Sequence, residues 1–330
     1  MAAPPDETNP AISVIIVNYN AGDRLARCLG AVAAQTYPAS EVIVIDNGSE
    51  DSSLQAADEA AIPITVIKAG ENLGFAAANN RAAKQASGDW LALLNPDAYP
   101  QPDWLREIAS AINKRPGYDA FGSLQIDAHD TDVIDGAGDV FHASGVPFRN
   151  YFGQPVKTAP PTAECFAPCA AAAVYRRETF EALGGFAESF FCYCEDLDLG
   201  YRLRLKGGRA LQLNEARVLH EGSGITGRAS DFAIYHGHRN RIWAYARNSP
   251  AMVLLLTFPY VLIVALGLFG MFLVSGKGQP YARAMADALK GLPKQMKVRK
   301  DIQSQRSVNT LDILRRLAWS PISLLQRRHK

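Results

Sequence analysis

Cysteine is scarce in this chain, with five residues among 330. The count is odd, and the two close pairs, Cys165 with Cys169 and Cys192 with Cys194, lack the C-x₂-C spacing that is common in zinc sites. An odd set with such spacings makes a poor disulfide framework. We therefore expect buried thiols, and neither a disulfide scaffold nor a structural zinc site.

A glycine-rich phosphate turn is missing as well. The first apolar run is followed by "NYNAGDRLA", which holds one glycine, whereas dinucleotide-binding dehydrogenases carry G-x-G-x-x-G after that strand. That class of enzyme is set aside. The opening "MAAPPDETNP" lacks the apolar core of a secretory signal, so we expect no signal peptide, disorder over residues 1–11 and a body that stays in the cytoplasm.

Charge is absent from residues 251–275 and unevenly spread elsewhere. Residues 1–250 hold 21 Lys and Arg against 30 Asp and Glu, a net charge of −9, whereas residues 276–330 hold 13 against 3, a net charge of +10. A basic C-terminal segment that follows an acidic domain indicates binding to an anionic surface. We predict an anionic membrane surface as that partner and expect no nucleic acid, which is the competing large anion.

The uncharged stretch, "AMVLLLTFPYVLIVALGLFGMFLVS", is long enough for the ~20 residues that cross the hydrocarbon of a bilayer. Basic residues flank it on both sides, so the positive-inside rule places both flanks in the cytoplasm. Pro259 lies where it can break a helix. We predict a membrane-associated segment over 249–330, with a re-entrant or in-plane hairpin rather than a span, and a basic amphipathic tail that rests on anionic lipid with Trp319 at the interface.

Short β-branched runs alternate with helical patterns in the first hundred residues. The runs "ISVIIVN", "EVIVIDN", "ITVIKAG" and "DWLALLN" are typical of strands buried on both faces. Between them, Leu25, Leu29 and Val32 fall on one side of a helix, and "GFAAANNRAAKQAS" is an alanine-rich helix. This alternation predicts an α/β fold with a mostly parallel sheet and helices on both faces.

The second half is harder to assign. In "EDLDLGYRLRLKGG" the apolar positions alternate, which favours a strand, yet the segment lacks β-branched residues and ends in Gly-Gly, which suits a helix. Residues 117–170 are rich in Gly, Pro and Asp without a clear period, and we expect them to belong to the acceptor side. The predicted domain covers 12–248, with a nucleotide-binding half over 12–100 and an acceptor half over 101–248.

Two acids lie at predicted strand ends, and ligands bind beyond the carboxyl ends of strands in such sheets. Asp46 in "VIDNGS" can accept hydrogen bonds from a base or a ribose, although taken alone it is better explained by a helix cap or a turn. Asp97 in "NPDA" is a hard oxygen ligand for Mg²⁺ or Mn²⁺, although Asn-Pro also initiates turns.

Two further stretches carry ionisable groups. In "YCEDLDLGYR" three crowded acids follow an aromatic run; crowding and desolvation raise the pKa of carboxyl groups, so that one can serve as a base, while the alternative is a solvated charged face. In "VLHEGSGITGR", His220 ends an apolar run and a neutral imidazole there can bind a metal, although a lone histidine is more often structural. The glycines with Arg228 can close over a diphosphate or form an ordinary loop.

In this order, the stretches "SVIIVNYN", "VIVIDNGSEDSS", "ENLGFAAANN", "LLNPDA", "GGFAESFFCYCEDLDLGYRLRLKG" and "LHEGSGITG" resemble the family 2 inverting glycosyltransferases with the GT-A fold, a Rossmann-like architecture. The most similar branch is the rhamnosyltransferase-like one of bacterial surface polysaccharide synthesis. The resemblance covers roughly residues 12–245. It also implies a helix over 195–206.

The resemblance implies a role for each matching residue. Asp196 would be the catalytic base, and Asp97 with His220 would bind Mg²⁺ or Mn²⁺ at the diphosphate. Asn95 replaces the first acid of the family's Asp-x-Asp motif, which leaves strict metal dependence open. The nucleotide-sugar would contact Val17, Tyr19, Asp46, Asn72, Asn79 and Asp97, and Glu195 and Asp198 would be acceptor or auxiliary residues.

The implied function is inverting transfer of a sugar, rhamnose being one candidate, from a nucleotide-diphosphate sugar donor. The acceptor would be a hydroxyl of a saccharide or lipid-linked saccharide, met at the cytoplasmic face of the plasma membrane. A non-catalytic membrane-associated scaffold is the alternative. It explains the apolar stretch and the basic tail, but it gives no reason for Asp46, Asp97, Asp196 and His220 to occur together.

Overall fold

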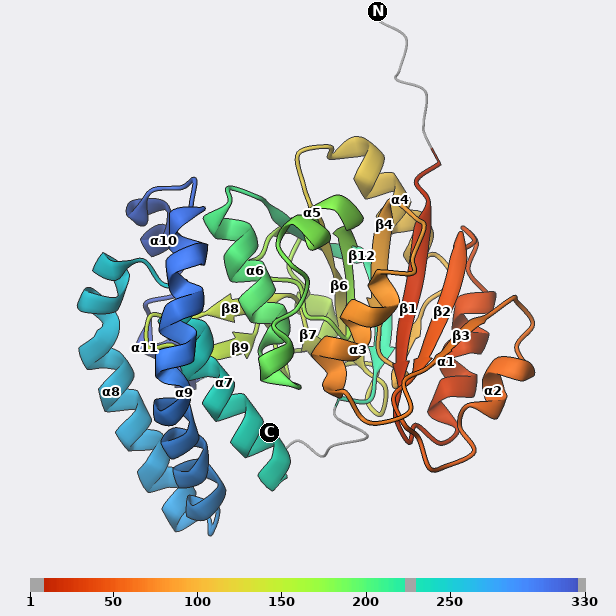
Figure 1. Ribbon diagram of the computed structural model, residues 1–330. Coiled ribbons are helices and arrows are strands. Elements are labelled where there is room, and N and C mark those ends of the chain that lie inside the picture. Colours follow the sequence, from red (N-terminus) through yellow and green to blue (C-terminus); the bar gives the residue numbers. More distant parts are fainter. Residues whose placement is uncertain (1–8, 223–229, 326–330) are drawn as a thin grey trace, which may run out of the picture.

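A mixed sheet of ten strands forms the centre of the molecule, in the order β10-β12-β6-β11-β4-β1-β2-β3, with β5 paired to β12 and β7 paired to β6 (Figure 1). The computed structural model describes residues 9–222 and 230–325. The strands are β1 Ile12–Asn18, β2 Glu41–Asp46, β3 Thr65–Lys68, β4 Trp90–Leu94, β5 Ala98–Pro100, β6 Ala120–Asp127, β7 Ile134–Gly136, β8 Asp139–Phe141, β9 Pro147–Arg149, β10 Ala163–Glu164, β11 Ala172–Arg176 and β12 Ala210–His220.

Helices cover both faces of this sheet, and others pack outside them. They are α1 Arg24–Ala33, α2 Gln55–Asp58, α3 Gly74–Ala83, α4 Trp104–Lys114, α5 Arg177–Ala182, α6 Glu195–Leu205, α7 Asp231–Asn248, α8 Ala251–Val274, α9 Gly278–Ser304, α10 Thr310–Arg316 and α11 Pro321–Leu325, with short 3₁₀ turns η1 Val156–Thr158 and η2 Glu188–Phe190. The four strands expected in the first hundred residues are β1 to β4, and β3-β2-β1-β4 run parallel. The α/β prediction is confirmed.

Alternate residues of β1 show why the strand is apolar throughout. Val14 and Ile16 pack with α1 and α4 on one face, whereas Ile15 and Val17 pack with α3 and α6 on the other. A strand buried on both faces therefore reads as a continuous apolar run. Because neighbouring strands are parallel and in register, their carboxyl ends meet along one edge: Asn18 pairs with Asp46, and Ile16 pairs with Leu94.

The segment with alternating leucines is a helix, α6, so the strand interpretation from periodicity is wrong and the helix that the resemblance implied is right. Burial explains the failure. Nearly every residue of α6 is enclosed, between the sheet on one side and α7 on the other. A helix buried all round has no polar stripe to reveal its period. The irregular 117–170 stretch likewise hides β6, whose eight residues pair with β11 and β12.

Asp198 joins α6 to α7 from within this core. Its carboxylate is fully buried; Oδ2 accepts from Nε of Arg202 at 2.8 Å and Oδ1 accepts from Nδ2 of Asn248 at 2.7 Å. Arg247 Nε lies 3.3 Å from Oδ1. Burial alone would raise the pKa of Asp198, but Arg247 and Arg202 lower it below its ordinary value, so the buried acid stays charged and paired.

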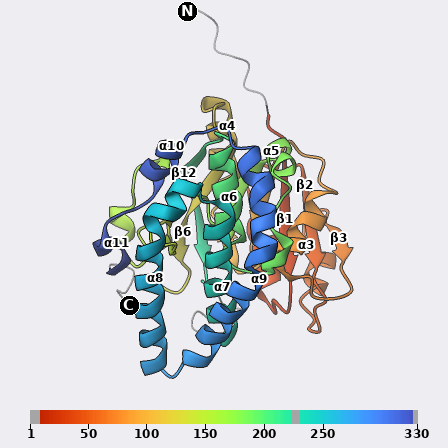
Figure 2. The ribbon, with the colours of Figure 1, turned by 60° about the vertical axis from the view of Figure 1, so that its left-hand side comes forward.

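The apolar stretch forms one continuous helix, α8, with Pro259 inside it, so the break expected at Pro259 is wrong. A turn at Gly276 reverses the chain, and α9 returns antiparallel beside α8 (Figure 2). Among the described residues, α8 is the helix long and apolar enough to cross a membrane, with a mean hydropathy of 2.5 and 17% of its most apolar window buried. Val253, Thr257 and Val261 face inward, while Leu255 and Ile263 are about 70% exposed (72% and 67%).

Candidate active site

The carboxyl ends of β1 and β2 form the donor side of the predicted site. Asp46 is nearly buried, and its Oδ1 accepts from Nδ2 of Asn18, which also lies 3.1 Å and 2.9 Å from the hydroxyls of Ser49 and Ser53. Val17 is enclosed in β1, and Tyr19 just beyond the strand is 36% exposed. The sequence pattern did not single out Asn18, although it is the residue that orients Asp46.

The "ENLGF" turn packs against this edge through a pair of asparagines. Asn47 Nδ2 donates to Oδ1 of Asn72 at 2.9 Å, and Asn47 Oδ1 accepts from the amide of Leu73. Gly48 permits the approach, because a Cβ there would lie 2.8 Å from the carbonyl carbon of Glu71. The predicted residue Asn72 therefore lies beside the end of β2. Asn79 is buried in α3, where its Nδ2 donates to the carbonyl of Phe75.

Asp97 and His220 are brought together by the pairing of β5 with β12. Ala98 pairs with His220 in the register of the two strands, so the residue before β5 meets the residue that ends β12. Asp97 Oδ1 lies 3.5 Å from His220 Nε2, both side chains are buried, and this nitrogen has no hydrogen-bond partner within the described part of the chain. A carboxylate oxygen and an imidazole nitrogen at this distance fit a shared cation.

Asp135, which the sequence analysis did not identify, holds the other side of the imidazole. His220 Nδ1 donates to Oδ2 of Asp135 at 2.7 Å, which leaves the lone pair of Nε2 directed at Asp97. The same carboxylate forms a short ion pair with Arg149. Burial would lower the pKa of His220, but its hydrogen bond with Asp135 and the nearby carboxylate of Asp97 raise it above its ordinary value.

Asp196 lies at the same edge of the sheet. Its Oδ2 accepts a hydrogen bond from the backbone amide of Ala170 at 3.1 Å. The backbone carbonyl of the following residue, Ala171, accepts a hydrogen bond from the amide of Asn95. The candidate base and the "NPDA" turn are thus attached to adjacent residues before β11. Burial raises the pKa of Asp196 above its ordinary value, although the amides of Ala170 and Leu197 and the guanidinium of Arg149 oppose this.

A second acid, Asp139 on β8, crowds Asp196. One ligand atom each from Asp139, Cys169 and Asp196 lies within 4.8 Å of the others. This cluster does not suit Mg²⁺ or Mn²⁺, because burial raises the pKa of the Cys169 thiol to about 12 and hard cations prefer oxygen. Burial, and then the charge of Asp196, raise the pKa of Asp139 well above its usual range. The neutral form of Asp139 is therefore favoured beside the candidate base.

Arg149 connects these groups. Its backbone is paired with that of Asp139 in the β8–β9 ladder, and its guanidinium forms an ion pair with Asp135. The aliphatic part of its side chain lies over Gly136, where a Cβ would approach Arg149 Cδ to 3.1 Å. Burial would lower the pKa of the guanidinium, but the surrounding Cys169, Asp135, Asp139 and Asp196 raise it. The buried charges form a chain from Asp97 through His220, Asp135 and Arg149 toward Asp196.

The remaining acids of "YCEDLDLGYR" take different places. Glu195 is buried, and burial followed by the charge of Asp196 raises its pKa well above the usual range. Asp198 is enclosed in its pairs with Arg202 and Asn248, and no part of the residue is exposed, which leaves it the auxiliary part of the predicted acceptor or auxiliary role. The glycine-rich stretch with Arg228 lies outside the described residues.

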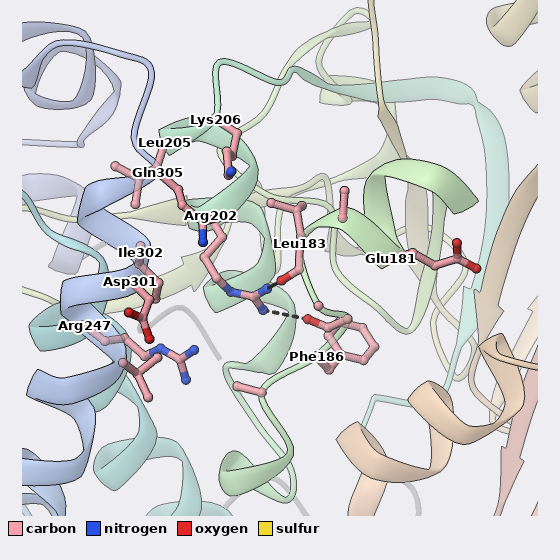
Figure 3. A pocket seen from close by; sticks show the side chains of 15 residues that line it. Glu181, Leu183, Phe186, Arg202, Leu205, Lys206, Arg247, Asp301, Ile302 and Gln305 are labelled. Atoms are coloured by element: carbon pink, nitrogen blue, oxygen red, sulfur yellow. Dashed lines mark hydrogen bonds between the residues drawn. The ribbon is translucent and has the colours of Figure 1, made fainter.

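A pocket of about 350 Å³ lies away from this site. It is bounded by the loop after α5, the C-terminal half of α6, and α9 (Figure 3). Arg202 fills one wall and donates to the carbonyls of Leu183 and Gly185. Neither Asp97, Asp196 nor His220 lines it. Its size alone therefore does not make it the reaction centre, since the predicted metal ligands and the predicted base lie elsewhere.

Comparisons with known proteins identify the family of the chain. The sequence model described as "Glycosyl transferase family 2" matches residues 13–184, more than half of the chain. The chain belongs to glycosyl transferase family 2. It is 30% identical over 253 residues to the N-acetylglucosaminyl-diphospho-decaprenol L-rhamnosyltransferase of Mycobacterium tuberculosis (strain H37Rv), covering 68% of this chain and 81% of that protein. The O-antigen biosynthesis protein RfbC of Myxococcus xanthus is 32% identical over 66% of this glycosyltransferase, which spans 18% of RfbC.

Solved structures share the fold of this glycosyltransferase. The mannosyltransferase PcManGT of Pyrobaculum calidifontis, in complex with GDP-Man and Mn²⁺, aligns with a TM-score of 0.55 at 19% identity, covering 94% of this chain and 89% of the other. GalNAc-T7 with UDP, GalNAc and Mn²⁺ aligns with a TM-score of 0.59 at 20% identity, covering 73% and 48%. The GT-A fold expected from the sequence is confirmed, and the chain is a glycosyltransferase.

Proposed function

We propose that this glycosyltransferase moves a sugar from a nucleotide-diphosphate donor to a hydroxyl of a saccharide or lipid-linked saccharide, with inversion, in cell-surface polysaccharide synthesis. The observation that carries the proposal is the attachment of Asp196 and of the Asp97 turn to adjacent residues, Ala170 and Ala171, at one sheet edge. The similarity to a rhamnosyltransferase whose name specifies a lipid-linked diphospho-sugar supports the same class of acceptor and makes rhamnose the first donor sugar to test.

Asp97 and His220 are the residues that would hold a divalent cation. Asp97 Oδ1 and His220 Nε2 face each other at 3.5 Å, and the carboxylate of Asp135 lies behind the imidazole, as metal-bound histidines usually have it. A Mg²⁺ or Mn²⁺ bound there would neutralise the negative charge that develops on the departing diphosphate. Asp46, with Asn18 orienting its carboxylate, would accept hydrogen bonds from the base or ribose.

Asp196 is proposed to remove the proton from the acceptor hydroxyl. One displacement, in which the hydroxyl oxygen attacks the anomeric carbon and the diphosphate leaves from the opposite face, inverts the configuration. The raised pKa of Asp196 brings its basicity nearer to neutral pH, and general-base help of this kind is typically worth ~10²–10⁴ in rate. The upward shift in the pKa of Asp139 favours its neutral form, which limits like-charge repulsion beside the base.

The α8–α9 pair is proposed to lie in the plane of the membrane surface, at the cytoplasmic face. Helix α8 exposes most of its apolar side chains, as an inserted helix requires. A simple span is disfavoured, because α9 lies beside both α8 and α7 and carries six Lys and Arg side chains that would enter the hydrocarbon. This placement would bring the acceptor's lipid anchor near the enzyme.

The base assignment predicts the behaviour of Asp196→Asn. We expect transfer to fall by ~10²-fold or more, because the carboxamide cannot accept the proton, while donor binding stays within about threefold. The donor is first identified by thermal-shift screening of UDP-, GDP- and dTDP-sugars with Mn²⁺, and its affinity is then measured by calorimetry. Near-normal turnover of Asp196→Asn would remove Asp196 from the base role.

The raised pKa of Asp196 predicts a pH dependence. The base works only when ionised, so kcat is lost as the pH falls through the folded-state pKa of Asp196, which lies above the ordinary ~3.9 of an aspartate. We expect the acid limb of kcat, measured at saturating donor and Mn²⁺, to lie clearly above pH 4. An acid limb at or below that value contradicts the environment described for Asp196.

The support of His220 by Asp135 predicts a metal phenotype. Asp135→Asn weakens the acceptor of the imidazole N–H, and we expect Mn²⁺ affinity to fall ~10-fold, within the range common for such partners. Binding of Mn²⁺ alone is measured by electron paramagnetic resonance. Asp132→Asn, an exposed acid on the same segment, is the control and should leave Mn²⁺ affinity unchanged. Equal affinities in wild type and Asp135→Asn would exclude the site.

The membrane proposal predicts flotation of the full chain with vesicles of phosphatidylcholine and phosphatidylglycerol. Leu255→Glu with Ile263→Glu should abolish it, because both side chains are exposed on α8 and a charge there opposes insertion. Val66→Glu, an exposed apolar residue on β3, is the control. Undiminished flotation of the α8 double variant would show that α8 is not the contact.

A further inference from the structure

The five residues before α6 adopt an unusual backbone. Phe191, Tyr193 and Cys194 have φ values of 66°, 71° and 65°, in the left-handed region that side chains other than glycine rarely enter. Phe191 has ψ −63°, and the amide of Cys192 donates to the carbonyl of Phe190 at 2.8 Å. This is the γ-turn with positive φ, the rare and strained form. Such a conformation persists only where its surroundings hold it.

A buried asparagine on α7 holds this loop, here called the 190–194 loop, and Arg239 on the same helix adds a hydrogen bond to the carbonyl of Phe190 at 3.1 Å. Asn240 is fully buried, and its Nδ2 lies 2.9 Å from the carbonyl oxygen of Phe190 and 2.8 Å from those of Cys192 and Tyr193. Three carbonyls thus converge on two amide hydrogens. In a regular helix these carbonyls would be parallel and in a strand successive carbonyls would alternate, so they converge on one point only while the loop keeps its strained shape.

The loop connects two sides of the proposed site. At its far end, the left-handed Cys194 is the N-cap of α6, two residues before Asp196. At its near end, the carbonyl of Phe191 accepts from the amide of Ala76 in α3 at 3.1 Å. Gly74 makes room for this contact, since a Cβ there would lie 2.5 Å from Phe191 Cδ2. A change of φ at residue 194 would rotate the first turn of α6 and move the carboxylate.

We propose that Asn240 is a positioning residue of the transfer reaction, holding the strained 190–194 loop in the conformation that directs Asp196 at the acceptor hydroxyl. The inference rests on the proposed role of Asp196 as the base. The strain is stored where a small backbone change alters the reaction geometry, and displacement of a reacting group by about 1 Å can cost ~10²-fold in rate.

The first arm of the test is Asn240→Ala in the full chain. We expect kcat to fall by roughly 10- to 100-fold, while the calorimetric affinity for the donor identified by screening changes by less than about threefold. Asn248→Ala is the matched control, because Asn248 is also fully buried on α7 and donates to α6, but through Asp198 and not through the loop. It should lower the melting temperature and keep kcat within about threefold.

The second arm separates strain from simple loss of packing. Glycine adopts positive φ without steric cost, so Cys194→Gly reduces the strain that Asn240 opposes. Cys194→Gly alone should keep kcat near wild type, and in the Asn240→Ala background it should raise kcat several-fold. A merely structural role of Asn240 gives no such rescue, since removing a second side chain only weakens the core further.

Two results would overturn the proposal: a wild-type kcat in Asn240→Ala, or an unrescued loss in the double variant. If Asn240→Ala melts below the assay temperature, Asn240→Ser carries the same test, because its hydroxyl donates one hydrogen bond and an intermediate kcat, rescued by Cys194→Gly, is expected. Normal transfer by Asp196→Asn would instead refute the proposed base. In that case Asn240 would still hold the loop, but the loop would have no role in proton removal.

Discussion

Paired burial of charge is the constraint on which the site of this glycosyltransferase depends. Asp135 lies between His220 and Arg149, with no exposed side-chain surface, and each of these partners faces further acids. Isolated buried charges are costly, whereas charges that pair and hydrogen-bond with one another are tolerated. The chain of groups from Asp97 toward Asp196 is therefore a single unit: removing one member leaves its neighbour buried and uncompensated.

Environment gives the crowded acids of α6 different properties, although they are neighbours in sequence. Asp198 faces Arg202 and Arg247, which lower its pKa, and serves to join two helices. Glu195 has no such partner, and burial raises its pKa well above the usual range. The pKa of Asp196 is raised by burial, but backbone amides and Arg149 offset part of this effect, so its environment is intermediate between those of Asp198 and Glu195. A half-buried carboxylate of this kind combines raised basicity with access, which suits a general base.

The helical pair at the C-terminus extends the enzyme without altering the sheet. Helix α9 packs along α7, which also supplies Asn240 and Asn248 to the loop and helix that carry Asp196. Contact of α8 with a membrane would thus be transmitted to α7 through a continuous helical layer. The proposed catalytic edge and the proposed membrane surface therefore share one supporting element, α7.

The amino-acid sequence by itself determined the first four strands, the parallel half of the sheet and the placing of Asp46 and Asp97 at strand ends, because period and burial coincide in strands that are apolar on both faces. The ordered motifs added the family and the helical state of α6. Only the tertiary structure revealed Asp135, Asp139, Arg149 and Asn240. The first three lie in the stretch that has no period, and their roles arise from contacts such as that between residues 135 and 220, far apart in the chain. Asn240 looks like an ordinary helical residue until the three carbonyls of the strained loop meet it. Local sequence reports which backbone a segment prefers; which charges neutralise one another, and which side chain holds a strained turn, is decided by the packing that brings distant segments together.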